Sequence, residues 1–233
     1  MRDELSKILN DLETFLLPGR CFGCNAHLYR GERLLCAFCR DELPLTEYNF
    51  CFENPVDRLF FGQKEVEKSA ALLFYHPGGL VQRLTHQLKY QGREELGDFF
   101  GEWYGALLAG ESLLRQTDWV FPVPLHPRKR RQRGYNQCSR LAGQIATALG
   151  ARYSEGFLVR CKHNPTQTAR GRHNRYKGIR GAFSLRNPAE LEGARILLVD
   201  DVITTGATLE ACCEAFAPVE RKRLFIAALA TVP

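Results

Sequence analysis

The chain has 233 residues, with 32 Lys or Arg, 26 Asp or Glu and a formal net charge of +6. Its 45% hydrophobic and 11% aromatic content is enough for a packed core, which excludes a globally disordered chain. The charge is uneven, because residues 121–186 hold 15 basic residues and one acid, Glu155, for +14, while the remainder carries −8. A basic segment in an otherwise acidic protein indicates an anionic partner such as a phosphate, a nucleotide or a nucleic acid.

The length allows one ordinary domain plus a small module, at the usual ~100–200 residues per domain. No apolar run approaches the ~18–20 residues that span a bilayer, and residues 1–17 lack the compact apolar region of a signal peptide. Nine cysteines are present. An odd number without an export signal favours a reducing cytoplasm and thiolate metal ligands over disulfides. We therefore expect a cytoplasmic protein.

Apolar residues at helical spacing predict a helix over residues 3–16, followed by a Cys-rich stretch and an aromatic, loop-like segment at 48–62. From residue 69 onward apolar runs alternate with helical repeats. Strands are expected at 69–75, 119–123, 196–199 and 223–230, and helices at 80–90, 94–108, 139–149 and 209–216. This alternation predicts an α/β fold with a parallel sheet. We divide the chain into residues 1–62, a helix and Cys-rich module, and residues 63–233, the main domain.

The Cys-rich stretch contains two Cys-x-x-Cys pairs, Cys21 with Cys24 and Cys36 with Cys39, separated by 11 residues. Two such turns can close a tetrahedral thiolate shell around Zn²⁺ at ~2.3 Å. Four thiolates leave no open coordination position, so this zinc would be structural. A redox pair or unligated thiols are the alternatives.

A phosphate-binding turn is predicted after the apolar run at 196–199. The run ends at Asp200 and Asp201, which a buried strand would deliver to the edge of the sheet where ligands bind in open α/β folds. The next helix follows a small turn of Thr204, Thr205, Gly206, Ala207 and Thr208. Free N–H groups at a helix N-terminus suit a phosphate, and carboxylates suit ribose hydroxyls. An ordinary strand–turn–helix with a threonine N-cap is the alternative.

The segment ILLVDDVITTGAT resembles the 13-residue phosphoribosyl pyrophosphate (PRPP) signature of type I phosphoribosyltransferases. The segments LKYQG, FPVPLHPRKRRQRGYNQ and TQTARGRHNRYKGIRGAF, with the Cys pairs, are similar to the ComF family of competence-associated phosphoribosyltransferase-like proteins, which includes the GntX proteins. The resemblance covers residues 15–231. It implies a type I phosphoribosyltransferase fold, a central parallel sheet with flanking helices and a small hood, preceded by a four-cysteine zinc-ribbon-like module.

The resemblance also implies roles for individual residues. Asp200 and Asp201 would hold the ribose, and Thr204, Thr205, Gly206, Ala207 and Thr208 would hold the 5′-phosphate. Mg²⁺ would be bound largely through PRPP itself.

The basic segment supplies candidates for the leaving pyrophosphate. Arginine forks match its oxygens, which makes Arg128 a catalytic candidate and Arg133 a PRPP contact; Lys89 of the LKYQG segment is a further catalytic candidate. Residues 160–180 are interpreted as a flap that closes over the ligand. Fifteen cations are more than one pyrophosphate can contact. Most of these residues therefore either lie on the solvated surface or contact a longer anion. Interleaved aromatic residues would suit stacking on single-stranded nucleic acid or belong to the core: Tyr135, Tyr153, Phe157, Tyr176 and Phe183.

Two functions follow. The first is Mg²⁺-dependent phosphoribosyl transfer from PRPP to an unidentified acceptor. The second is a non-catalytic PRPP or nucleotide sensor, or a single-stranded-DNA-binding component of the DNA uptake machinery. The resemblance to competence proteins supports that second role and implies a DNA-translocating competence helicase as partner.

Overall fold

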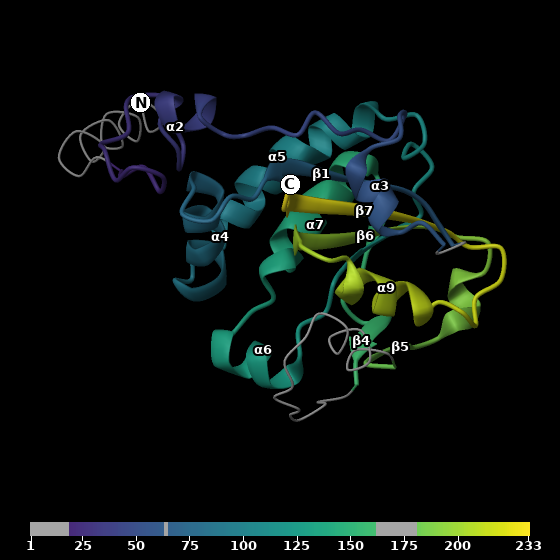
Figure 1. Ribbon diagram of the computed structural model, residues 1–233. Helices are drawn as coiled ribbons and strands as arrows, with labels where there is room; N and C mark the ends of the chain where they lie inside the picture. Colours follow the sequence, from purple (N-terminus) through teal and green to yellow (C-terminus); the bar gives the residue numbers. More distant parts are fainter. Residues whose placement is uncertain (1–18, 63–64, 162–180) are drawn as a thin grey trace, which may run out of the picture.

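A computed structural model of the chain describes residues 19–62, 65–161 and 181–233 (Figure 1). The predicted helix at 3–16 and all but the first two residues of the predicted flap at 160–180 lie outside the described residues. At the centre is a five-stranded parallel sheet in the order β1-β7-β6-β2-β3. Its strands are β1 Val66–Phe74, β2 Trp119–Pro122, β3 Arg152–Tyr153, β6 Arg195–Ile203 and β7 Arg223–Thr231.

The sheet is covered on both faces. The longer helices are α4 Leu80–Tyr90, α5 Glu95–Gly110, α7 Gln137–Leu149 and α9 Ala207–Glu214. Successive residues of a strand point to opposite faces, and in β6 Leu197 packs with α4, α5 and α7 whereas Leu198 packs with α9. A strand buried on both sides is apolar at every position. That is why 196–199 has no polar alternation.

Shorter elements complete the fold. They are α2 Ala37–Asp41, α3 Pro55–Leu59, α6 Pro127–Arg133, the 3-10 turn Pro188–Leu191, and an antiparallel pair of strands, β4 Leu158–Arg160 and β5 Phe183–Leu185. The expected α/β class with a parallel sheet is confirmed. Within the described part of the chain, every helix is too short or too polar to cross a lipid bilayer.

Helix α6 forms where the sequence analysis expected only a basic segment. Its N-cap is His126, whose ring accepts a hydrogen bond from the Arg128 backbone N–H at 3.1 Å, and Pro127 occupies the first helical position. Gly134, at φ +88°, ends the helix in the left-handed conformation. These local signals match the proline-first, glycine-last pattern of helix ends.

The Cys-rich residues and the segment after them pack directly on the sheet domain. The Gln87 side chain donates a 2.7 Å hydrogen bond to the Phe22 carbonyl, and Leu35 belongs to the same hydrophobic cluster as α4 and α5. Residues 48–62, expected as a loop, contain α3 and run along β1, where the Asn54 amide donates to the Ser69 carbonyl at 2.8 Å. A division of the chain after residue 62 stays a prediction.

Candidate functional site

The connections of the sheet diverge between β2 and β6. Strand β3 follows β2 outward on one side, and β7 follows β6 outward on the other. Open α/β sheets bind ligands at such a switch point, beyond the carboxyl ends of the strands. Asp200 and Asp201 lie near the carboxyl end of β6, and the Val123 N–H that follows β2 donates to the Val199 carbonyl at 2.8 Å. The predicted carboxylates therefore lie where the topology expects a ligand.

Both carboxylates are buried. Asp200 is 8% and Asp201 5% exposed. Asp200 Oδ1 accepts from the Asp201 backbone N–H at 2.9 Å, and Asp201 Oδ1 accepts from the Val202 N–H at the same distance. The Lys89 ammonium at the end of α4 lies 2.5 Å from Asp201 Oδ2. Three of the predicted site residues are thus brought together.

The acidities of this cluster are strongly perturbed. Burial, followed by the neighbouring Asp201 carboxylate, raises the pKa of Asp200 to about 7. For Lys89 burial acts to lower the pKa, but Asp201 outweighs it and the pKa is raised. Cys138 is not among the site residues expected from the sequence; it is fully buried at the start of α7 and donates its thiol to Asp200 Oδ1 at 3.6 Å. Burial, Asp201 and Asp200 raise the pKa of Cys138 well above its usual value, so it stays a neutral donor.

The turn after β6 leads directly into α9. Gly206 is the N-cap residue at φ +75° and carries no side chain to cap the helix. Thr204 is exposed, and Thr205 and Thr208 are half-buried. A hollow of about 30 Å³ lies within the turn, and Asp200 is among the residues that line it. Hydroxyls and uncapped helical N–H groups therefore face one small space, as a phosphate requires.

Phe60, which follows α3, packs over this turn. A Cβ at Gly206 would lie 3.4 Å from the Phe60 ring, which is 3% exposed. The sequence signal for this contact was only the aromatic composition of residues 48–62.

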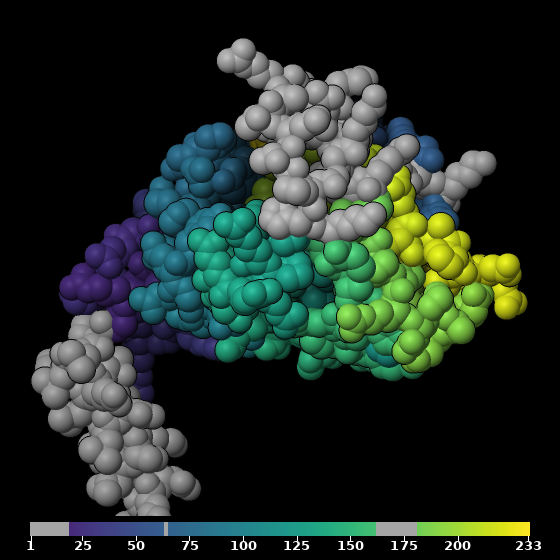
Figure 2. Space-filling view, turned by 90° about the horizontal axis from the view of Figure 1, so that it is seen from below, coloured from purple at the N-terminus to yellow at the C-terminus, as the bar shows by residue number. Residues whose placement is uncertain are grey.

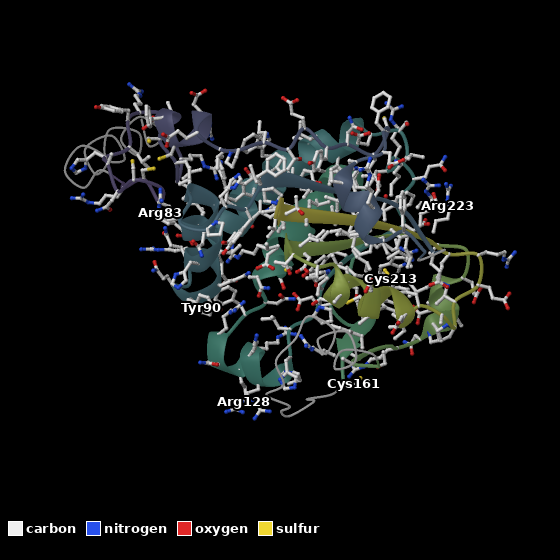
Figure 3. The ribbon with its side chains drawn as sticks, in the orientation of Figure 1. Arg83, Tyr90, Arg128, Cys161, Cys213 and Arg223 are labelled. Atoms are coloured by element: carbon white, nitrogen blue, oxygen red, sulfur yellow. The ribbon has the colours of Figure 1, made fainter. Side chains whose placement is uncertain are left out.

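Helix α6 lies beside the end of α4, and Figure 2 shows the teal surface around α6 adjoining the steel-blue surface of α4. Between them is a cavity of about 390 Å³, lined by Lys89, Tyr90, Gly92, Lys129, Gln132, Arg133 and Tyr135. The Arg133 guanidinium lies over the Tyr90 ring at 5.1 Å from its centroid and donates to Gln137. Arg133 thus shares a cavity with Lys89. Arg128, by contrast, is exposed at the outer side of α6 and points away from the sheet (Figure 3).

The four cysteines of the two pairs lie with their sulfur atoms within 4.8 Å of one another. Cys21 Sγ accepts from the backbone N–H groups of Gly23 and Cys36, each at 3.3 Å. Although burial acts in the opposite direction, these backbone donors lower the pKa of Cys21 to about 7. A Cβ at Gly23 would lie 2.7 Å from Cys39 Sγ, so only glycine fits there. Four converging thiols suit a tetrahedral metal ion.

Comparisons with known proteins agree with this geometry. The phosphoribosyl transferase domain family matches residues 136–233, which include α7, β6, the turn and α9. Over 209 residues, 83% of this chain and 88% of the relative, the chain is 26% identical to DNA utilization protein YhgH of Escherichia coli O6:H1. It is 26% identical over 201 residues to Competence protein F of Haemophilus influenzae, covering 82% and 87% of the two chains. The chain belongs to the ComF family.

Among solved structures, this ComF-family chain is similar to the allosteric regulatory enzyme of purine biosynthesis, at 20% identity and a TM-score of 0.38. A second is glutamine PRPP amidotransferase from B. subtilis complexed with ADP and GMP, at 22% identity and a TM-score of 0.38. Each match covers 61% of the ComF-family chain but only 30% of the solved chain.

Four of the five aromatic residues considered for stacking lie in the described part of the ComF-family protein, and each has a partner within the fold. Phe157 packs against Trp119 and Phe121, and Phe183 is 5% exposed. The Tyr135 hydroxyl donates to the Leu88 carbonyl. Tyr153 is paired with Glu155, and Tyr176 lies outside the described residues. One exposed aromatic side chain beside the site is Tyr90, which was not singled out from the sequence although it lies in the LKYQG segment.

Proposed function

We propose that this protein binds PRPP and transfers its phosphoribosyl group to an acceptor, in a Mg²⁺-dependent reaction that inverts the anomeric carbon. The observation that carries the proposal is the Lys89–Asp201 ion pair beside Asp200, at the switch point and directly before the TTGAT turn. Buried carboxylates, a cation and a phosphate turn in this order match the three parts of PRPP: ribose, diphosphate and 5′-phosphate.

The 5′-phosphate is assigned to the turn of Thr204, Thr205, Gly206, Ala207 and Thr208. The hollow of about 30 Å³ has about the volume that one water molecule occupies in liquid water. We therefore assign the phosphate to the mouth of the hollow rather than to its interior. There the exposed Thr204 hydroxyl and the first N–H groups of α9 can donate to phosphate oxygens. The partial positive charge at the helix N-terminus adds to this attraction.

The ribose hydroxyls are assigned to Asp200 and Asp201, whose carboxylate oxygens can accept from them. Asp201 Oδ2 is held by Lys89 in this structure. On PRPP binding, Lys89 is expected to exchange Asp201 for a diphosphate oxygen, because the diphosphate carries a larger total negative charge than one carboxylate. Arg133, in the same cavity as Lys89, is assigned to the diphosphate as well. Mg²⁺ arriving with PRPP would neutralise part of that charge.

Transfer breaks the bond between the anomeric carbon and the pyrophosphate oxygen and forms one to the acceptor on the opposite face. Negative charge grows on the leaving pyrophosphate as it departs. Lys89 and Arg133 would stabilise that charge, a contribution that typically amounts to about 3–4 kcal/mol for one well-placed donor. Arg128 was predicted to share this role. Its outward direction makes it the weakest of the catalytic assignments.

Calorimetry with PRPP and Mg²⁺ tests the proposal. The wild-type protein should bind PRPP, and the Asp200→Asn/Asp201→Asn double variant should lose binding while its thermal unfolding stays cooperative. Asp41→Asn, an exposed aspartate on the Cys-rich module, is the matched control and should bind normally. Equal affinity in the double variant and the wild type would refute the site.

A structural zinc ion is proposed for Cys21, Cys24, Cys36 and Cys39, defining a four-cysteine module within residues 1–62 that precedes the phosphoribosyltransferase-like domain of residues 63–233. Four sulfur atoms within 4.8 Å of one another support it. The reduced thiolates that it needs also support a cytoplasmic location. Metal analysis should find about one zinc per chain, and Cys36→Ser/Cys39→Ser should remove it.

A second candidate function is binding of single-stranded DNA in its uptake, with a competence helicase as partner. The relatives named Competence protein F and DNA utilization protein favour it. So does the exposed run of four basic residues at positions 128–131 on α6. Gel shifts with single-stranded DNA should weaken steeply with salt, and neutralising residues 128–131 should lower the slope. Absence of any shift at low salt would end this candidate.

A further inference from the structure

We propose that the cavity between α4 and α6 is a nucleotide-binding subsite, in which the base stacks on the Tyr90–Arg133 wall and the phosphate contacts Lys129 and Arg133. The chemistry is that of one nucleotide unit, free or within a single strand. Mutual exclusion of nucleotide and PRPP, argued below, rests on the proposed function. The subsite itself does not.

The first support is the wall. Tyr90 is 66% exposed although it ends a helix whose apolar face is buried, and the Arg133 guanidinium lies over its ring at 5.1 Å. His86 adds a ring whose centroid is 4.9 Å from that of Tyr90. Exposed aromatic rings and arginine guanidinium groups are what unpaired bases stack on in nucleic-acid-binding proteins. A diphosphate alone has no planar ring that could stack on these side chains.

The second support is the size and charge of the cavity. Its volume of about 390 Å³ falls in the range of about 300–1,000 Å³ that holds whole small organic ligands. Three cations line it, Lys89, Lys129 and Arg133, and the described residues that line it include no carboxylate. An anion is therefore favoured, and one with a planar part fits both the charge and the wall.

The third support is the connection to the PRPP site. Lys89 lines the cavity and is also the ion-pair partner of Asp201 at 2.5 Å. A nucleotide phosphate in the cavity would draw on Lys89 and Arg133, the cations assigned above to the diphosphate. The nucleotide and PRPP should therefore weaken each other's binding.

The test is calorimetry on the full chain with dAMP, with 2-deoxyribose 5-phosphate, which has the same phosphate but no base, and with a short oligo(dA). We expect dAMP or oligo(dA) to bind more tightly than the sugar phosphate. Tyr90→Ala should weaken that binding by roughly 5- to 100-fold, the range for loss of one base–aromatic stack. Tyr90→Phe should keep it. Tyr29→Ala removes a tyrosine that is 80% exposed on the Cys-rich module and should change nothing.

Each outcome decides the proposal. Tyr90-dependent binding of dAMP supports the subsite with a free nucleotide as ligand, and Tyr90-dependent binding of oligo(dA) alone supports it with a strand as ligand. Equal binding of dAMP and the sugar phosphate, or binding that Tyr90→Ala leaves unchanged, would overturn it. Binding of dAMP that disappears only in Asp200→Asn/Asp201→Asn would place the nucleotide at the phosphate turn and would also overturn it. Failure of PRPP binding alone would count against the proposed function and leave the Tyr90 comparison valid.

Discussion

Lys89 Nζ lies 2.5 Å from Asp201 Oδ2, which joins the end of α4 to the central strand β6. The Asp201 side chain is 7% exposed and that of Lys89 25% exposed. The lysine therefore neutralises one buried carboxylate at the site where a ribose is proposed to bind. The stability of the fold therefore depends on this ion pair.

Removing the lysine should therefore destabilise the fold. Lys89→Met leaves the Asp201 carboxylate buried without its cation. Breaking a fully buried pair costs about 3–5 kcal/mol, and about 2 kcal/mol is expected here because Lys89 is partly exposed. Urea unfolding measures the loss. Lys89→Met/Asp201→Asn should recover most of it, and Arg83→Met, an exposed cation of the same helix, should stay within about 0.5 kcal/mol of the wild type. A double variant no more stable than the single one would contradict the role of the pair.

The raised pKa of Asp200 gives stability a pH dependence. Its pKa is about 7 in the fold against an ordinary value of 3.8. Between these values the folded state keeps a proton that the unfolded state has lost, so this group's contribution is full below pH 4 and is lost as the pH rises through 7. Asp200→Asn cannot ionise. From pH 5 to pH 8 it should gain stability relative to the wild type, by up to about 3 kcal/mol. Urea unfolding that shows the same dependence of stability on pH in Asp200→Asn and in the wild type would contradict a raised pKa for Asp200.

Periodicity was sufficient to predict the main elements. The helix at 80–90 was predicted with its observed bounds, because Leu80, Leu84 and Leu88 form one buried stripe. The strand at 196–199 was predicted because its apolar residues are buried on both faces, although β6 continues to Ile203. The Asp-Asp-turn sequence also indicated the site, since its position after a buried strand places it at the edge of the sheet.

Helix caps and tertiary contacts explain what periodicity missed. Helix α6 lacks an apolar stripe and is set by its caps, so a run of arginines gave no helical signal. Phe157 looked available for stacking, but its contacts with Trp119 and Phe121 depend on β2 lying beneath it. The pairing of Lys89 with Asp201 depends on how α4 crosses the sheet, which spacing along the chain does not encode.

The Cys-rich module offers a test through Gly23. A Cβ there would lie 2.7 Å from Cys39 Sγ and 2.9 Å from a methyl group of Leu80, so Gly23→Ala must push the cysteines apart or lift the module from α4. In competition with a chelator, Gly23→Ala should bind zinc at least about tenfold more weakly than the wild type, the loss typical of disturbed ligand geometry at metal sites. Gly19→Ala meets only Leu28 at 3.5 Å and should retain zinc as the wild type does. Equal retention in the two variants would remove Gly23 from the proposed metal centre.

The phosphate turn can be tested by a pair of glycines with matched backbone strain. Gly206 has φ +75° and Gly150 has φ +64°. Alanine in this region costs about 1–2 kcal/mol. At Gly150 the new Cβ meets nothing within 4 Å, and at Gly206 it meets the Phe60 ring at an ordinary 3.4 Å. Gly206→Ala and Gly150→Ala should therefore lose similar stability in urea unfolding.

Ligand binding should separate the two variants. Gly206 is the N-cap of α9, and its backbone sets the direction of the N–H groups assigned to the 5′-phosphate. Relaxation of φ away from +75° would turn those groups, so Gly206→Ala should weaken PRPP binding by about tenfold, comparable to the loss of one charge-assisted hydrogen bond. Gly150→Ala, at the C-terminal end of α7, should change PRPP affinity by less than about twofold, since it adjoins no residue assigned to PRPP. Similar affinities in the two variants, at similar stability, would show that the turn does not hold the phosphate.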